Sequence, residues 1–163
     1  MTLDMQAALL TADTEALDGA SSGLTTGTIV LTLNGEMPVE DLCAGDRIIT
    51  RDCGMAVLKA IHTRKITTRP YRISAERLGP GRPTTDTFVP ADQPILVRGL
   101  LATALFNSDA AVVPVSRLAD GEYIAKCKEQ TLRVYELEFD MPHVIYANGL
   151  ELASAPHDVA IAA

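Results

Sequence analysis

Few side chains in this sequence are suited to nucleophilic or metal-based chemistry. The 163 residues include only three cysteines, Cys43, Cys53 and Cys127, and three histidines. The cysteine count is odd, and no two cysteines have the C-x-x-C spacing that is typical of zinc and redox sites. A disulfide framework, a metal site and a bound cofactor are therefore not expected, and the cysteines are interpreted as reduced structural residues.

The composition excludes several classes of function. The net charge is −7, from 21 acidic and 14 basic residues, and no cluster of Lys and Arg supplies the basic surface that nucleic-acid binding needs. Aromatic residues make up 4% of the chain and Trp is absent, which argues against stacking platforms for bases. No apolar stretch is long enough to cross a membrane, and no Sec-type signal peptide is recognised at the N-terminus. The predicted location is the cytoplasm, or export by a route without an N-terminal signal peptide.

The elements that must position these residues are predicted to be short β-strands. Residues 1–22 are interpreted as a flexible or helical N-terminal segment, with the helical pattern over residues 4–17, and residues 155–163 as a C-terminal tail. Between them, runs of β-branched residues alternate with turn residues, which predicts an all-β domain. Asn34-Gly35 predicts the turn of the first hairpin. Strands are expected at 28–33, 37–39, 47–50, 55–62, 71–73, 87–89, 95–97, 112–115, 123–126, 132–139 and 144–147, and a short helix at 100–106.

The order of several short motifs resembles a known family. Gly27-Thr28 is followed by Asn34-Gly35-Glu36, by the segment 38–42 (P-V-E-D-L) and by the segment 45–52 (G-D-R-I-I-T-R-D). This order is similar to the opening of bacterial Hint domains, the self-processing domains of the Hedgehog/intein type. Further segments that resemble the family are 71–73, 78–81, 112–118, 120–121 and 140–150. The resemblance covers residues 23–154 and implies the Hint fold, a horseshoe or disc of many short strands.

The resemblance also implies self-cleavage chemistry, but two of its residues are replaced here. In the family, the first residue is usually Cys, which takes the preceding acyl group from nitrogen to sulfur, and a later His protonates the leaving amine. The Cys position corresponds to Gly23 and the His position to Gln93, or to Pro94 if the register shifts by one. Asp140 and His143 match the closing segment and are the implied remnant of the catalytic site.

Three interpretations remain open. The leading one is a Hint domain that is inactive in autoproteolysis and is retained as a folded binding or accessory module, with another protein as its partner. The second is an active self-cleaving domain that uses Ser22 together with His143. The third is an unrelated β-rich binding domain. If the scaffold keeps the strained geometry of the family, Gly23→Cys together with Gln93→His is expected to restore thiol-dependent cleavage.

Overall fold

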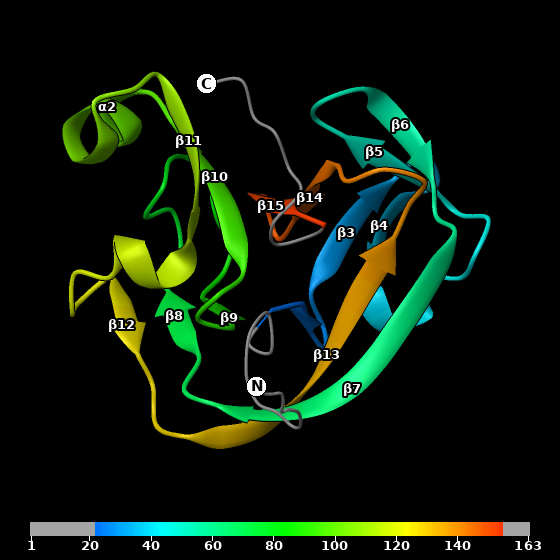
Figure 1. Cartoon of the computed structure of the whole chain (residues 1–163), viewed down its shortest axis with the longest axis horizontal. Coiled ribbons are helices and arrows are strands. Elements are labelled where there is room, and N and C mark those ends of the chain that lie inside the picture. Colours follow the sequence, from blue (N-terminus) through cyan, green and yellow to red (C-terminus); the bar gives the residue numbers. More distant parts are fainter. Residues whose placement is uncertain (1–21, 155–163) are drawn as a thin grey trace, which may run out of the picture.

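Antiparallel strands, most of them short, are the main regular structure of the computed structural model, which describes residues 22–154 (Figure 1). The strands are β2 (Leu24–Thr25), β3 (Ile29–Thr32), β4 (Gly35–Pro38), β5 (Arg47–Thr50), β6 (Gly54–Val57), β7 (Ala60–Thr68), β8 (Tyr71–Ile73), β9 (Thr87–Val89), β10 (Pro94–Arg98), β11 (Ala110–Pro114), β12 (Ile124–Lys126), β13 (Gln130–Glu138), β14 (Val144–Ala147) and β15 (Leu150–Ala153). The helix α2 (Leu100–Phe106) and two 3-10 turns, η1 (Val39–Asp41) and η2 (Val115–Leu118), complete this part of the chain.

The strands form three sheets. The largest has eight strands in the order β11-β10-β15-β14-β3-β5-β6, with β4 paired to β3. The two smaller sheets have the orders β12-β8-β9 and β2-β13-β7. Along the sequence, the chain passes repeatedly from one of these sheets to another. This arrangement fits the horseshoe of many short strands that the resemblance implies.

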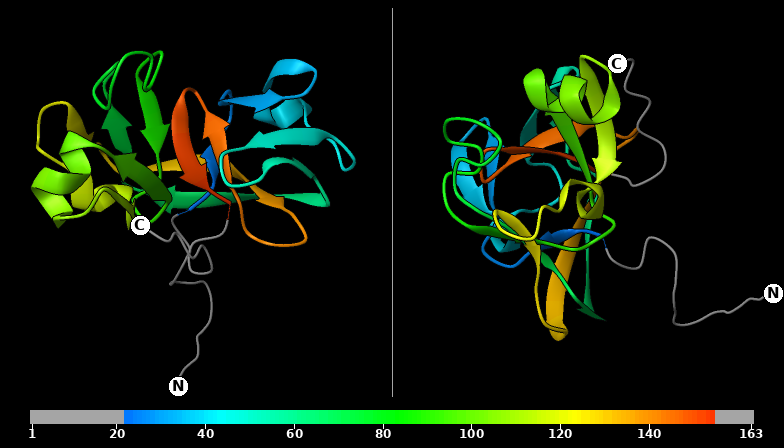
Figure 2. Two further views of the ribbon diagram at one scale, coloured as in Figure 1. Left: turned by 90° about the horizontal axis from the view of Figure 1, so that it is seen from above. Right: turned by 90° about the vertical axis from the view of Figure 1, so that its left-hand side faces the viewer.

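A long ribbon of β7 and β13 connects the two ends of the molecule. The two strands pair along their whole lengths, from Gln130 opposite Thr68 to Glu138 opposite Ala60. Figure 1 shows β8 and β12 near one end of this ribbon and β5 and β6 near the other, while α2 lies away from it beside β10 and β11, and Figure 2 gives two further views. β2 pairs with β13 on its other side, through Leu24 opposite Tyr135. Because β2 pairs with β13, the start of the described chain lies along this ribbon.

The core is built from aliphatic side chains, as the low aromatic content requires. Fully buried examples are Ile48, Ile145 and Leu150 in the eight-stranded sheet and Ile73 in the β12-β8-β9 sheet. Burial of this apolar surface is the main stabilising contribution, at roughly 1.5–3 kcal/mol for each large side chain relative to exposure. Within residues 22–154, no helix has the length and apolar character needed to span a membrane.

The all-β prediction is confirmed, as are the short helix at 100–106 and the strand at 47–50. Two boundaries were wrong. The first hairpin turns at residues 33–34, because Thr32 pairs with Gly35 and its hydroxyl also accepts a hydrogen bond from Asn34 N–H (3.0 Å). The strand expected at 55–62 is two strands, because Leu58 still hydrogen bonds with Gly45 and Asp46 just before β5, whereas Lys59 N–H donates to Glu138 O and the chain then pairs with β13.

Two strands were missed, and one expected helix cannot be compared. β2 is only two residues long, and β15 follows β14 so closely that both were read as one closing segment. The helical pattern over residues 4–17 lies outside the described residues.

Candidate functional site

The nitrogen of the Ser22–Gly23 peptide bond forms a hydrogen bond with one side chain, that of Gln93. Pairing of Leu24 with Tyr135 places Gly23 against β13, and Gly23 N–H donates a buried hydrogen bond of 2.8 Å to Gln93 Oε1. The two positions that the sequence resemblance assigns to the family's nucleophile and proton donor therefore meet in this chain. Pro94 does not prevent this contact, although it follows Gln93 directly.

Gln93 is fixed by a complete set of hydrogen bonds. Its side chain is buried, and Nε2 donates to Pro94 O (2.9 Å) and to Ala153 O (2.8 Å). Because Nε2 can only donate and both acceptors are carbonyls, these bonds settle the amide orientation and leave Oε1 facing Gly23. Oε1 is an acceptor only, so this side chain has no proton to give to the Gly23 nitrogen.

Position 23 has little room for a side chain. Gly23 has φ +117°, a conformation that residues with a Cβ rarely adopt. A Cβ added there would lie 3.0 Å from Val134 Cβ and 3.3 Å from Tyr135 O. The backbone here is thus shaped for glycine, and a nucleophilic side chain at this position would be both strained and crowded.

Ser22 is buried beside Gly23 and faces a carboxylate. Its Oγ donates a hydrogen bond of 3.4 Å to Glu136 Oε2, and the same oxygen accepts one from Arg64 (3.2 Å). Ser22, Gly23, Gln93 and Glu136 line one small pocket. Glu136 was not singled out from the sequence, because the β13 pattern shows only that it alternates with apolar neighbours.

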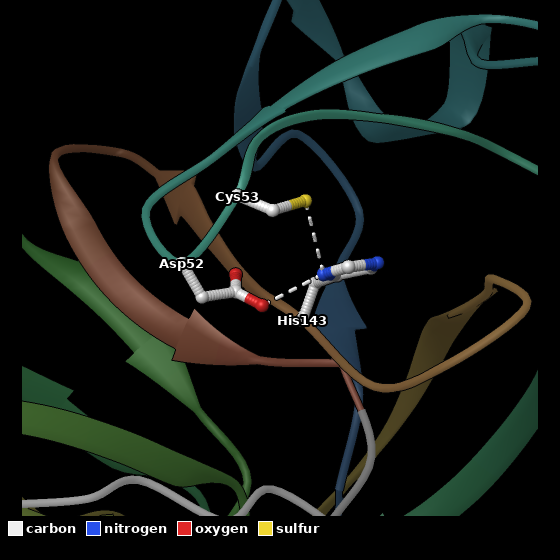
Figure 3. A group of neighbouring side chains, drawn as sticks. All are labelled: Asp52, Cys53 and His143. Atoms are coloured by element: carbon white, nitrogen blue, oxygen red, sulfur yellow. Dashed lines mark hydrogen bonds and ion pairs between the residues drawn. The ribbon is translucent and has the colours of Figure 1, made fainter.

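The His143 ring has other partners than this pocket (Figure 3). Its Nδ1 lies 2.8 Å from Asp52 Oδ2 and 3.6 Å from Cys53 Sγ, and its ring packs edge-on against Phe139. Only the main chain of His143 approaches the pocket, because its N–H donates to Oγ of Ser154, which lines it.

Asp52 is tied to the same segment of chain. Its Oδ1 accepts a hydrogen bond from Val144 N–H (3.0 Å) while Oδ2 faces His143. Burial raises the pKa of Asp52, but the hydrogen bonds from Val144 and His143 outweigh this effect, and the pKa lies below its ordinary value. Asp52 and Cys53 were read from the sequence as turn residues, and no local motif marks them as neighbours of a histidine.

Asp140 is the other residue predicted from the closing segment. It is exposed in the link between β13 and β14. Among the contacts of residues 22–154, its carboxylate makes no hydrogen bond to Gly23, Gln93 or His143. Its catalytic role stays a prediction.

The sequence matches the family described as Hint domain over residues 22–158. The fold is similar to a DnaB intein from Synechocystis sp. PCC 6803, with a TM-score of 0.56 and 12% identity over 83% of this chain and 99% of that one. It is also similar to a bacterial intein-like domain from Clostridium thermocellum, with a TM-score of 0.54 and 15% identity over 82% of this chain and 98% of that one. No curated protein matches the sequence.

Proposed function

Because this chain belongs to the Hint domain family, we propose that it keeps the family's scaffold as an intact module and does not cleave the Ser22–Gly23 peptide bond. The observation that supports this proposal most directly is the hydrogen bond from Gly23 N–H to Gln93 Oε1. In this bond an acceptor oxygen faces the Gly23 nitrogen, where the family's chemistry needs a proton donor.

Cleavage by an acyl shift needs two groups that this site does not provide. A side-chain nucleophile must attack the carbonyl that precedes its own residue, and glycine has none. A proton must then reach the departing nitrogen, and Gln93 holds that nitrogen through an acceptor oxygen. General acid catalysis of such a step is worth about 10² to 10⁴ in rate, so its loss alone is severe.

The rival interpretation, self-cleavage by Ser22, receives less support. A shift at Ser22 would break the bond that precedes Ser22, whereas Gln93 is positioned on the next peptide nitrogen along the chain. The His143 ring, the expected acid or base, is directed at Asp52 and Cys53. The family match removes the third interpretation, an unrelated β-rich domain.

The test is a reporter protein fused upstream of the full chain and treated with thiol or hydroxylamine, which capture thioesters and esters. We expect the fusion to keep its full mass, measured by mass spectrometry, in both conditions. Ser22→Ala is the matched control, because it removes the hydroxyl of the residue that directly precedes Gly23 and leaves the backbone unchanged. Release from the unmodified chain that is lost in Ser22→Ala would establish the rival mechanism, and any release at the Ser22–Gly23 bond would overturn the proposal.

An attempted repair gives a second check. Gly23→Cys with Gln93→His restores the family's residues, but the added Cβ meets Val134 and Tyr135. We therefore expect weaker release than the sequence alone predicts, together with a lower free energy of unfolding. As an intact module, the domain is proposed to act by binding another protein.

A further inference from the structure

A second group of reactive side chains lies away from the Gly23 pocket. Asp52 and Cys53 lie on the turn between β5 and β6, and His143 lies directly before β14 (Figure 3). One ligand atom of each, a carboxylate oxygen, Sγ and Nδ1, lies within 4.8 Å of the others. None of the three lines the Gly23 pocket, so the proposed function does not account for them.

The geometry does not suit a nucleophilic triad. In a Cys-His-Asp relay, the thiol and the carboxylate use opposite nitrogens of the ring, so that a proton can pass through it. Here Cys53 and Asp52 both approach Nδ1 (3.6 and 2.8 Å). One ring nitrogen carries at most one hydrogen, so the ring cannot transfer a proton from one partner to the other.

The same geometry suits a metal ion. A tetrahedral Zn²⁺ with ordinary bond lengths has its nitrogen and sulfur ligands about 3.6 Å apart and its nitrogen and oxygen ligands about 3.4 Å apart. The Cys53–His143 separation is 3.6 Å. The Asp52–His143 separation is 2.8 Å and would have to widen by about 0.6 Å as the ion replaces the shared hydrogen.

The surrounding groups hold the three ligands in place. Val144 N–H binds Asp52 Oδ1 and thereby leaves Oδ2 free to turn toward an ion. Thr50 Oγ1 lies 3.3 Å from Cys53 Sγ, where a hydroxyl stabilises a thiolate. Supporting hydrogen bonds of this kind orient metal ligands and strengthen binding. His143 is buried while Asp52 and Cys53 are exposed, so the ion could enter from solvent and keep a water ligand.

We propose that Asp52, Cys53 and His143 form a three-ligand site for Zn²⁺, with water as the fourth ligand. Thiolate, imidazole and carboxylate are a donor set that zinc accepts, and three protein ligands leave one position open. The site would tie the β5–β6 turn to the start of β14. It departs from the sequence prediction, which found no metal site because the spacing of the cysteines alone gave no motif.

Titration of the metal-free full chain with Co²⁺ tests this site, because cobalt reports its ligands in the absorption spectrum. We expect one equivalent to bind, with a thiolate-to-cobalt charge-transfer band and the visible bands of tetrahedral cobalt, and Zn²⁺ to displace it. Cys53→Ser should abolish the charge-transfer band, whereas Cys43→Ser and Cys127→Ser should retain it. Asp52→Asn should weaken binding about tenfold or more.

Two results would overturn the proposal. The first is a cobalt spectrum that remains that of the hydrated ion when the protein is in excess. The second is a charge-transfer band that persists in Cys53→Ser. Urea unfolding shows whether Cys53→Ser is folded. Because Cys53 is exposed, we expect this variant to fold as the parent does. Zn²⁺ should raise the free energy of unfolding of the parent and leave that of Cys53→Ser unchanged.

Discussion

A methyl group on Gly23 measures whether position 23 can accept any side chain, and hence any nucleophile. In Gly23→Ala, the residue keeps φ near +117°, which costs about 1–3 kcal/mol for a residue with a Cβ. The new Cβ also lies 3.0 Å from Val134 Cβ, and overpacking of this kind costs about 1–3 kcal/mol. The lower entropy of the unfolded chain returns about 0.4–1 kcal/mol. Together these contributions lower the expected free energy of unfolding by about 1–6 kcal/mol.

Gly35→Ala is the matched control for the crowding. Gly35 has φ +102°, but no heavy atom lies within 4 Å of a Cβ added there. The backbone strain and the unfolded-state effect are therefore similar in both variants and cancel in their difference. Urea unfolding should show Gly23→Ala less stable than Gly35→Ala by about 1–3 kcal/mol, the overpacking contribution.

Equal stability of the two variants would refute the crowding argument, and only the backbone strain would then oppose a cysteine at position 23. A third variant locates the source of the crowding. Val134→Ala removes Cγ2, which lies 3.3 Å from the added Cβ, but leaves the closer Val134 Cβ. In this background the cost of Gly23→Ala should decrease in part and not disappear.

Three further predictions concern the hydrogen bonds of the two sites and of β15. Gln93→Ala leaves the Gly23 N–H and the Ala153 carbonyl without their partner and should lower the free energy of unfolding by about 2–4 kcal/mol in urea. Because the pKa of Asp52 is lowered by folding, its carboxylate stabilises the fold above its ordinary pKa and this contribution is lost as pH falls. The stability of Asp52→Asn should therefore fall less steeply than that of the parent below about pH 4. Glu151→Gln weakens the paired hydrogen bonds from Arg98 (2.9 and 2.6 Å) to a buried carboxylate and should cost about 1–3 kcal/mol, measured by the same unfolding assay.

Most strands could be predicted because their signals are local. The run at 47–50 and the alternation along 132–139 each show a strand within a few residues of sequence. The break after Leu58 could not be predicted, since it depends on a change of pairing partner from β5 to β13, which is much later in the sequence. Local hydropathy continues through Leu58 without a change.

The two candidate sites also differ in how far the sequence predicts them. The resemblance to the family's fold implies that Gly23, Gln93 and His143 lie close together; Gly23 and Gln93 are in contact, whereas the His143 ring faces Asp52 and Cys53. The approach of Cys53 to His143 joins loops 90 residues apart and depends on how β5 lies against β14. No spacing rule in a single sequence contains that information.

The pairing of β2 with β13 also has a consequence for biosynthesis. Ser22 contacts Glu136, which is 114 residues later in the chain, and Gln93 depends on the carbonyl of Ala153 in the last described strand. The segment around Gly23 therefore leaves the ribosome long before β13 is synthesised, and it is not paired with β13 during that time. Contacts between residues so far apart in sequence form slowly, and the unpaired segment is exposed to proteases and to other chains until they form.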